Sequence, residues 1–98
     1  MAFTDSYDFD LLKNEAENLV LKELEHQLNS YRRNLCRCNE CVVDMAAIAL
    51  NEVKPLYRFS LLGTLYAAQA MNEKSYADSV KKAVAQAIEK VRKNPSHD

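Results

Sequence analysis

The chain is poor in the residues that make tight turns. Its 98 residues include one glycine and two prolines, of which only Pro55 is interior, and there is no tryptophan. Folds built from many β-hairpins need frequent glycine, proline and asparagine at their turns. The alternation of apolar and polar residues that marks a half-buried strand is almost absent as well. These absences exclude a mainly β protein and favour an all-α fold.

Long apolar runs are also lacking. No stretch approaches the roughly 20 residues that cross a bilayer. The first ten residues carry three acidic and no basic side chains, whereas a secretory signal begins with a basic segment. We therefore expect a cytoplasmic protein with neither a membrane span nor a secretory signal.

Neither sign of charge is in excess, and groups arranged for catalysis are not evident. Thirteen Lys and Arg stand against 14 Asp and Glu, which leaves a formal net charge of −1. A dedicated DNA-binding surface needs an excess of positive charge, so we expect no DNA partner. The chain shows no glycine-rich phosphate loop, no nucleophile beside a base and no paired carboxylates. We expect no enzymatic activity, and we expect Asp44 to form a cap or to pair with an arginine.

The composition is that of one small soluble domain. With 48% hydrophobic and 28% charged residues, residues 1–98 form a single domain, in which we expect 1–8 and 95–98 to be frayed. The core of so short a chain is thin, so a metal ion or a dimer interface would add to its stability.

Apolar periodicity predicts about four helices. Residues 9–31 have apolar side chains at three- and four-residue steps, and residues 41–53 are apolar on nearly all sides. A helix of the second kind is buried, so we expect it at the centre of the core or in a dimer interface. Pro55 makes residues 54–60 an extended connection. A third helix begins near Leu61, and an apolar stripe runs from Tyr76 to the Asn-Pro pair at 94–95. The polar residues 72–75 between them are either a break between two helices or an exposed turn of one longer helix.

Three cysteines gather just before the second predicted helix. Cys36, Cys38 and Cys41 form a Cys-x-Cys-x-x-Cys motif, and thiols in the cytoplasm are reduced. Thiolates so spaced can converge on one soft cation, for which zinc is the first candidate. An iron–sulfur cluster usually takes four cysteines, and a redox sensor is a third option. The fourth ligand stays open among His26, His97, water, an acidic residue and a partner chain.

Basic and aromatic residues flank the same helix. Arginine binds phosphate through two N–H groups and stacks on bases, so these residues suit an anionic ligand. A dimer or a bend in the chain is needed to bring the residues before the helix and those after it to one ligand. On the residues alone, the simpler interpretation is that they are solvated at the surface or buried in the core and bind no ligand. They are Arg32, Arg33 and Arg37 before the helix and Lys54, Tyr57 and Arg58 after it.

Four short segments of the chain form a recognisable set. They are Asn-Leu-Val at 18–20, Cys-Arg-Cys-Asn-Glu-Cys at 36–41, Val-Asp-Met-Ala-Ala-Ile-Ala-Leu-Asn at 43–51 and Lys-Pro-Leu-Tyr at 54–57. Together they resemble the ComFB family of late competence development proteins, and the similarity extends over roughly residues 15–95. The resemblance implies a small, helical, dimeric bacterial protein without an enzymatic role, in which cysteines hold a structural zinc ion.

The resemblance also implies a ligand. Cyanobacterial relatives are regarded as receptors for cyclic dinucleotides, chiefly cyclic di-GMP, and a two-fold symmetric ligand matches a two-fold dimer. We predict a homodimer, formed through the apolar second helix and the neighbouring apolar stripes, that binds cyclic di-GMP or cyclic di-AMP and signals to an unknown protein partner. The candidate contacts are Arg32, Arg33, Arg37, Lys54, Tyr57 and Arg58. The alternative is a zinc-stabilised structural or adaptor protein of the competence machinery with no small ligand.

Overall fold

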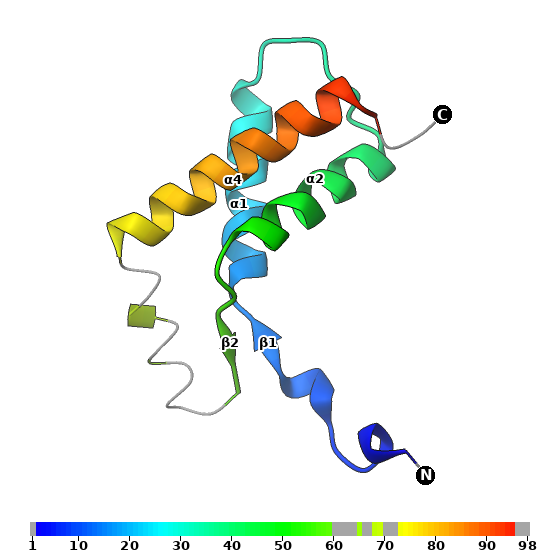
Figure 1. Ribbon diagram of the computed structural model, residues 1–98, viewed down its shortest axis with the longest axis vertical. Helices are drawn as coiled ribbons and strands as arrows, with labels where there is room; N and C mark the ends of the chain where they lie inside the picture. The colour runs from blue at the N-terminus through cyan, green and yellow to red at the C-terminus, as the bar shows by residue number, and fades with distance from the viewer. Residues whose placement is uncertain (1, 60–64, 66–67, 70–72, 96–98) are drawn as a thin grey trace.

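Three α-helices make up most of the part of the chain that the computed structural model describes, residues 2–59, 65, 68–69 and 73–95. They are α1 (Ala16–Ser30), α2 (Asn39–Glu52) and α4 (Lys74–Lys93). Helices α2 and α4 share the largest contact, and α1 packs against both, as Figure 1 shows. The helix predicted to begin near Leu61 falls mainly outside the described residues.

Helix α4 supplies the longest row of buried side chains. The stripe predicted along this helix is confirmed, because each of its members is at most 8% exposed. The lysines of the last helical turn lie at the end where the helix dipole favours cations, and α4 ends at Lys93, just before Asn94 and Pro95. The buried stripe consists of Tyr76, Val80, Ala83, Val84, Ala87, Ile88 and Val91.

Helix α2 buries one side rather than all of them. Cys41, Met45 and Ala49 are fully or almost fully buried between α1 and α4, whereas Val43 is 59% exposed and Ala47 is also exposed. The apolar composition of this helix correctly predicted that it packs against neighbouring helices. The expectation of burial on nearly all sides is wrong for the single chain, because the side that carries Val43 and Ala47 is exposed.

The first predicted helix begins later than its periodicity indicated. Helix α1 begins at Ala16, not at residue 9, and a short strand, β1 (Lys13–Asn14), precedes it. This strand pairs antiparallel with β2 (Tyr57–Arg58), with Lys13 opposite Arg58. The all-α expectation is therefore corrected to a mostly helical domain with a small two-stranded sheet.

The side chain of Asn14 explains this change of structure. Its Oδ1 accepts hydrogen bonds from the backbone N–H of Leu56 at 2.7 Å and of Ala16 at 3.2 Å. The N–H of Glu15 donates to the carbonyl oxygen of Leu56 at 2.9 Å. Because the partner segment lies about forty residues away in sequence, local periodicity carries no sign of it.

Residues 2–12 extend away from the three helices (Figure 1). They contain two short 3-10 turns, η1 (Phe3–Asp5) and η2 (Phe9–Leu11), and neither turn has a buried residue. The radius of gyration is 15.7 Å, compared with about 13 Å for a compact domain of this length. The projecting segment accounts for part of this difference.

Candidate metal centre and basic residues

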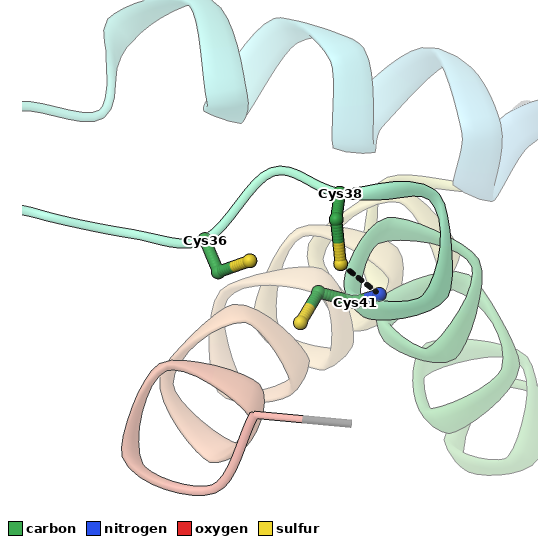
Figure 2. Close-up of side chains that lie close together, drawn as sticks. All are labelled: Cys36, Cys38 and Cys41. Atoms are coloured by element: carbon green, nitrogen blue, oxygen red, sulfur yellow. Dashed lines mark hydrogen bonds between the residues drawn. The ribbon is translucent and has the colours of Figure 1, made fainter. Parts of the chain in front are cut away.

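The three cysteines converge at the start of α2. Their sulfur atoms all lie within 4.8 Å of one another. Figure 2 shows the three side chains close together at the start of this helix. Cys36 and Cys38 come from the loop between α1 and α2 and are partly buried, whereas Cys41 lies in the first turn of α2 and is fully buried. Zinc–sulfur bonds of about 2.3 Å in a tetrahedron place sulfur atoms somewhat less than 4 Å apart. Small side-chain movements would therefore close the triad around one ion.

The local fold explains why the motif converges. Cys38 has an extended backbone and is the N-cap of α2, where its Sγ accepts the N–H of Cys41 at 3.4 Å. The amino end of a helix carries a partial positive charge that favours thiolates. The motif thus uses the sharp entry into a helix to bring its second and third sulfur atoms together.

Arg37 fixes the cysteine loop to α1. Its Nη1 donates to the carbonyl oxygen of Leu28 at 2.8 Å and its Nη2 to that of Tyr31 at 3.5 Å. These carbonyls lie at the end of α1, where the last backbone acceptors lack partners within the helix. Arg37, which lies between Cys36 and Cys38 in the sequence, therefore holds the cysteine loop against the end of α1.

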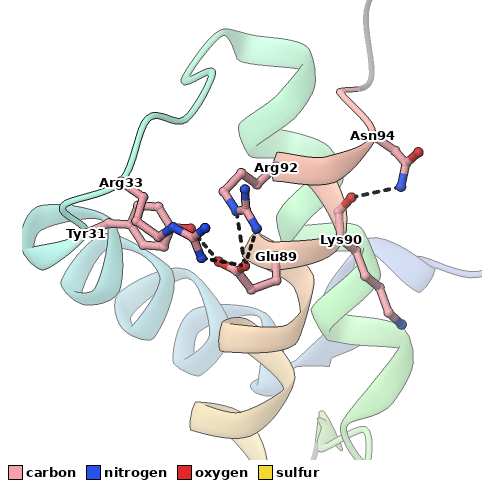
Figure 3. A network of polar contacts seen from close by, with 6 residues as sticks. All are labelled: Tyr31, Arg33, Glu89, Lys90, Arg92 and Asn94. Atoms are coloured by element: carbon pink, nitrogen blue, oxygen red, sulfur yellow. Dashed lines mark hydrogen bonds and ion pairs between the residues drawn. The ribbon is translucent and has the colours of Figure 1, made fainter.

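A second group of contacts, centred on Glu89, ties the same loop to α4 (Figure 3). The Tyr31 hydroxyl donates to Glu89, Arg92 donates to it through Nε at 3.1 Å and Nη2 at 2.9 Å, and Arg33 lies 3.6 Å from it. The Tyr31 hydroxyl, followed by the Arg92 guanidinium, lowers the pKa of the Glu89 carboxyl. The same carboxylate raises the pKa of Tyr31 and that of Arg92.

This group was not predicted from the sequence. The Glu89 and Arg92 spacing of three residues on a helix was a visible signal for an ion pair. Nothing local indicated that Tyr31, 58 positions away from Glu89, would complete it.

Among the described residues, no fourth potential ligand joins the triad. His26 is exposed on α1, and His97 lies outside the described residues. Within the part of the chain that the structure describes, the three cysteines alone form a group of potential ligands.

The remaining predicted binding residues divide between two regions. Arg32 and Arg33 follow α1, whereas Tyr57 and Arg58 form β2 and Lys54 lies between α2 and β2. Figure 1 shows the strand pair at the start of α1, at the other end of that helix from the loop that follows it. The 15 residues of α1 separate the regions by roughly 22 Å at 1.5 Å per residue. One protomer therefore does not bring the six residues together.

The strand-pair region contains an ion pair and an exposed aromatic ring. Arg58 donates through Nε to Glu15 and, together with Asn18, lowers the pKa of the Glu15 carboxyl. The Tyr57 ring is 58% exposed, so it is a surface ring rather than a core one, and Lys54 is exposed. The Lys54 carbonyl accepts the Tyr76 hydroxyl at 2.7 Å, which fixes the connection to α4.

Residues 13–95 match the family model described as late competence development protein ComFB. The chain belongs to the ComFB family. A solved structure of the late competence protein ComFB from Bacillus subtilis is similar in fold, with a TM-score of 0.66 at 24% identity. The match covers 87% of this chain and 94% of that one. No curated protein matches the chain.

The ComFB match contains the cysteine triad and both basic regions but begins at Lys13. The projecting residues before it are therefore an addition to the part shared with the family model. Among the described residues of this ComFB-family chain, no helix combines the length and apolar character needed to cross a membrane.

Proposed function

We propose that this ComFB-family protein is a non-catalytic regulator, with a structural zinc ion at Cys36, Cys38 and Cys41 and a cyclic dinucleotide as its ligand. The convergence of three sulfur atoms within 4.8 Å carries the zinc assignment, because thiolates favour zinc over hard cations. The ion would tie the cysteine loop to α2 and add to the stability of a thin core.

Metal content tests the zinc assignment directly. The purified full chain should hold one zinc ion per protomer, and cobalt exchange should produce the charge-transfer bands of thiolate ligands. Cys36→Ser should lower metal affinity at least ~10-fold, whereas His26→Ala should leave it unchanged. A chain that retains no zinc and gives no thiolate bands with cobalt would overturn the assignment.

A cyclic dinucleotide suits the strand-pair region. The exposed Tyr57 ring supplies a stacking surface, and Arg58, the next residue of β2, supplies a cation that pairs with Glu15 in the single chain. An aromatic ring and a guanidinium are groups that recognise a base and a phosphate. In a two-fold dimer each protomer offers the same set to one half of cyclic di-GMP. The strand-pair region and the basic residues after α1 in one protomer then need not contact the same ligand.

One observation favours the adaptor as a second candidate. Three of the six predicted contacts already bind within the chain: Arg33 pairs with Glu89, Arg37 with α1 carbonyls and Arg58 with Glu15. An adaptor of the competence machinery would use these arginines for stability alone, with no small ligand.

Thermal melting of the zinc-loaded protein separates the two candidates. A ligand that binds only the folded state raises the melting temperature by mass action. We expect a rise with cyclic di-GMP or cyclic di-AMP but not with GTP, and its loss in Tyr57→Ala, with the exposed Lys93→Ala as control. If neither cyclic dinucleotide raises the melting temperature, the adaptor without a small ligand is the better interpretation.

A further inference from the structure

The projecting segment, residues 2–12, carries a cluster of exposed apolar side chains that we call the aromatic arm. Its three rings contact one another, with centroids 5.0 Å apart for Phe3 and Tyr7 and 5.7 Å apart for Phe3 and Phe9. Contiguous apolar surface on a folded domain marks an interaction site. The apolar side chains of the arm, each at least 46% exposed, are Phe3, Tyr7, Phe9, Leu11 and Leu12.

The strand pair holds the end of the arm beside a further exposed ring, that of Phe59. Lys13 of β1 lies opposite Arg58 of β2, so Leu12 and Phe59 are the next residues along the two antiparallel segments. The arm and Phe59 enclose a cavity of about 390 Å³, a volume within the range of roughly 300 to 1,000 Å³ for binding pockets. Its lining is apolar apart from one carboxylate, and consists of Tyr7, Asp8, Phe9, Leu11, Leu12 and Phe59.

The charge of the arm restricts what can bind there. It carries Asp5, Asp8 and Asp10, all exposed, and no basic side chain. These carboxylates would repel nucleic acid and an anionic lipid surface, and the arm of a second copy would bring the same three charges. The complementary surface is that of another protein, with apolar side chains at its centre and basic ones around them.

The secondary structure of that surface follows from the shape of the site. An extended segment binds along a free sheet edge, but β1 and β2 are only two residues long each. An amphipathic helix instead presents apolar side chains three and four residues apart on one face, with charged ones beside them. A helix therefore suits a single apolar cavity with acidic groups around it.

We propose that the aromatic arm and Phe59 bind a basic amphipathic helix of another protein. The apolar side chains of that helix enter the cavity, and its lysines or arginines face the three aspartates of the arm. The site uses neither the zinc ion nor the cyclic dinucleotide, so it goes beyond the proposed function and does not depend on it.

A synthetic peptide tests this site on the full, zinc-loaded chain. The probe is a fluorescent peptide of about 18 leucine and lysine residues at helical spacing, and fluorescence anisotropy measures its binding. We expect saturable binding that weakens as the salt concentration rises, because salt screens exposed charges. A peptide with glutamate in place of lysine, and one of the same composition without an apolar face, should bind at least ~10-fold more weakly.

Variants of the chain locate the binding site. Phe9→Ser and Phe59→Ser each remove a ring that lines the cavity and should weaken peptide binding at least ~10-fold. Asp8→Asn with Asp10→Asn should weaken it at low salt and much less at high salt. All four positions are exposed, so circular dichroism and zinc content should not change.

Two matched controls lie elsewhere on the surface. Val43→Ser changes an exposed apolar residue on α2, and Glu25→Gln with Asp78→Asn removes two exposed acidic groups from α1 and α4. Both proteins should bind the peptide as the wild type does.

The proposal is overturned if the wild type shows no saturable binding of the leucine–lysine peptide, or if Phe9→Ser and Phe59→Ser leave that binding unchanged. It is also overturned if sedimentation equilibrium finds a wild-type dimer that Phe9→Ser dissociates, because a second copy then covers the arm. Zinc content and the melting shift with cyclic di-GMP report the proposed function separately, and either can fail while the peptide still binds.

Discussion

Replacing Asn14 by alanine should destabilise the protein more than its surface position suggests. Its Oδ1 is the acceptor for two backbone N–H groups, those of Leu56 and Ala16. Both of these residues are buried, at 7% and 0% exposure. The variant Asn14→Ala leaves both donors without this acceptor, where water has little access.

The expected magnitude follows from those two bonds. A buried donor left unsatisfied costs about 1 to 3 kcal/mol, and an ordinary hydrogen bond contributes about 0.5 to 1.5 kcal/mol. We therefore expect the free energy of unfolding to fall by about 2 to 4 kcal/mol. For a domain of this size the melting temperature falls by about 4 to 8 °C per kcal/mol, so the decrease should be at least ~8 °C.

Urea unfolding followed by circular dichroism, at fixed zinc and protein concentration, measures this loss. Asn14→Asp keeps an oxygen acceptor and should stay within about 1 kcal/mol of the wild type. Asn29→Ala, on the exposed side of α1, should change stability by no more than ~0.5 kcal/mol. An Asn14→Ala protein as stable as Asn29→Ala would refute the role assigned to this side chain.

Three further outcomes follow from the core, the acidic groups and the metal centre. Met45→Ala removes a fully buried side chain and should cost about 2 to 5 kcal/mol in urea, whereas Val43→Ala on the exposed side of α2 should cost little. The pKa of Glu15 lies below its ordinary 4.5 in the folded protein. The pairing of Glu15 with Arg58 therefore stabilises the fold above pH 4.5, and this stabilisation is lost as the pH falls through the lowered pKa. The melting temperature of Glu15→Gln should accordingly fall less steeply at acid pH than that of the wild type. Zinc removal by a chelator should lower the melting temperature and release the cysteine loop to proteolysis, and unchanged melting after verified zinc loss would contradict a structural ion.

Helix α4 and the start of α2 could be predicted because both are local features. Seven apolar positions from Tyr76 to Val91 follow the helical repeat, and all seven are buried. Three cysteines in six residues at a helix start limit how far apart their sulfur atoms can lie. The family was recognisable from the same short segments, and the match over residues 13–95 confirms it.

The errors came from residues whose structure depends on distant partners. Periodicity extended the first helix back to residue 9, but pairing with Tyr57 and Arg58 turns residues 13–14 into a strand. The composition of α2 likewise could not show which of its sides α1 and α4 would leave exposed.

Spacing along a few turns of chain was enough to predict that helices occur at α1, α2 and α4, which cysteines are candidate metal ligands and to which family the chain belongs. The partners of the arginines depend on packing between distant segments: Arg37 binds the end of α1, and Arg33 and Arg58 pair with Glu89 and Glu15. Only the tertiary structure decided these partners, and that the aromatic residues before Lys13 lie outside the core. The physical reason is that a polar side chain takes whichever partner the packing of distant segments brings within hydrogen-bond reach, and an apolar one is buried only if that packing covers it.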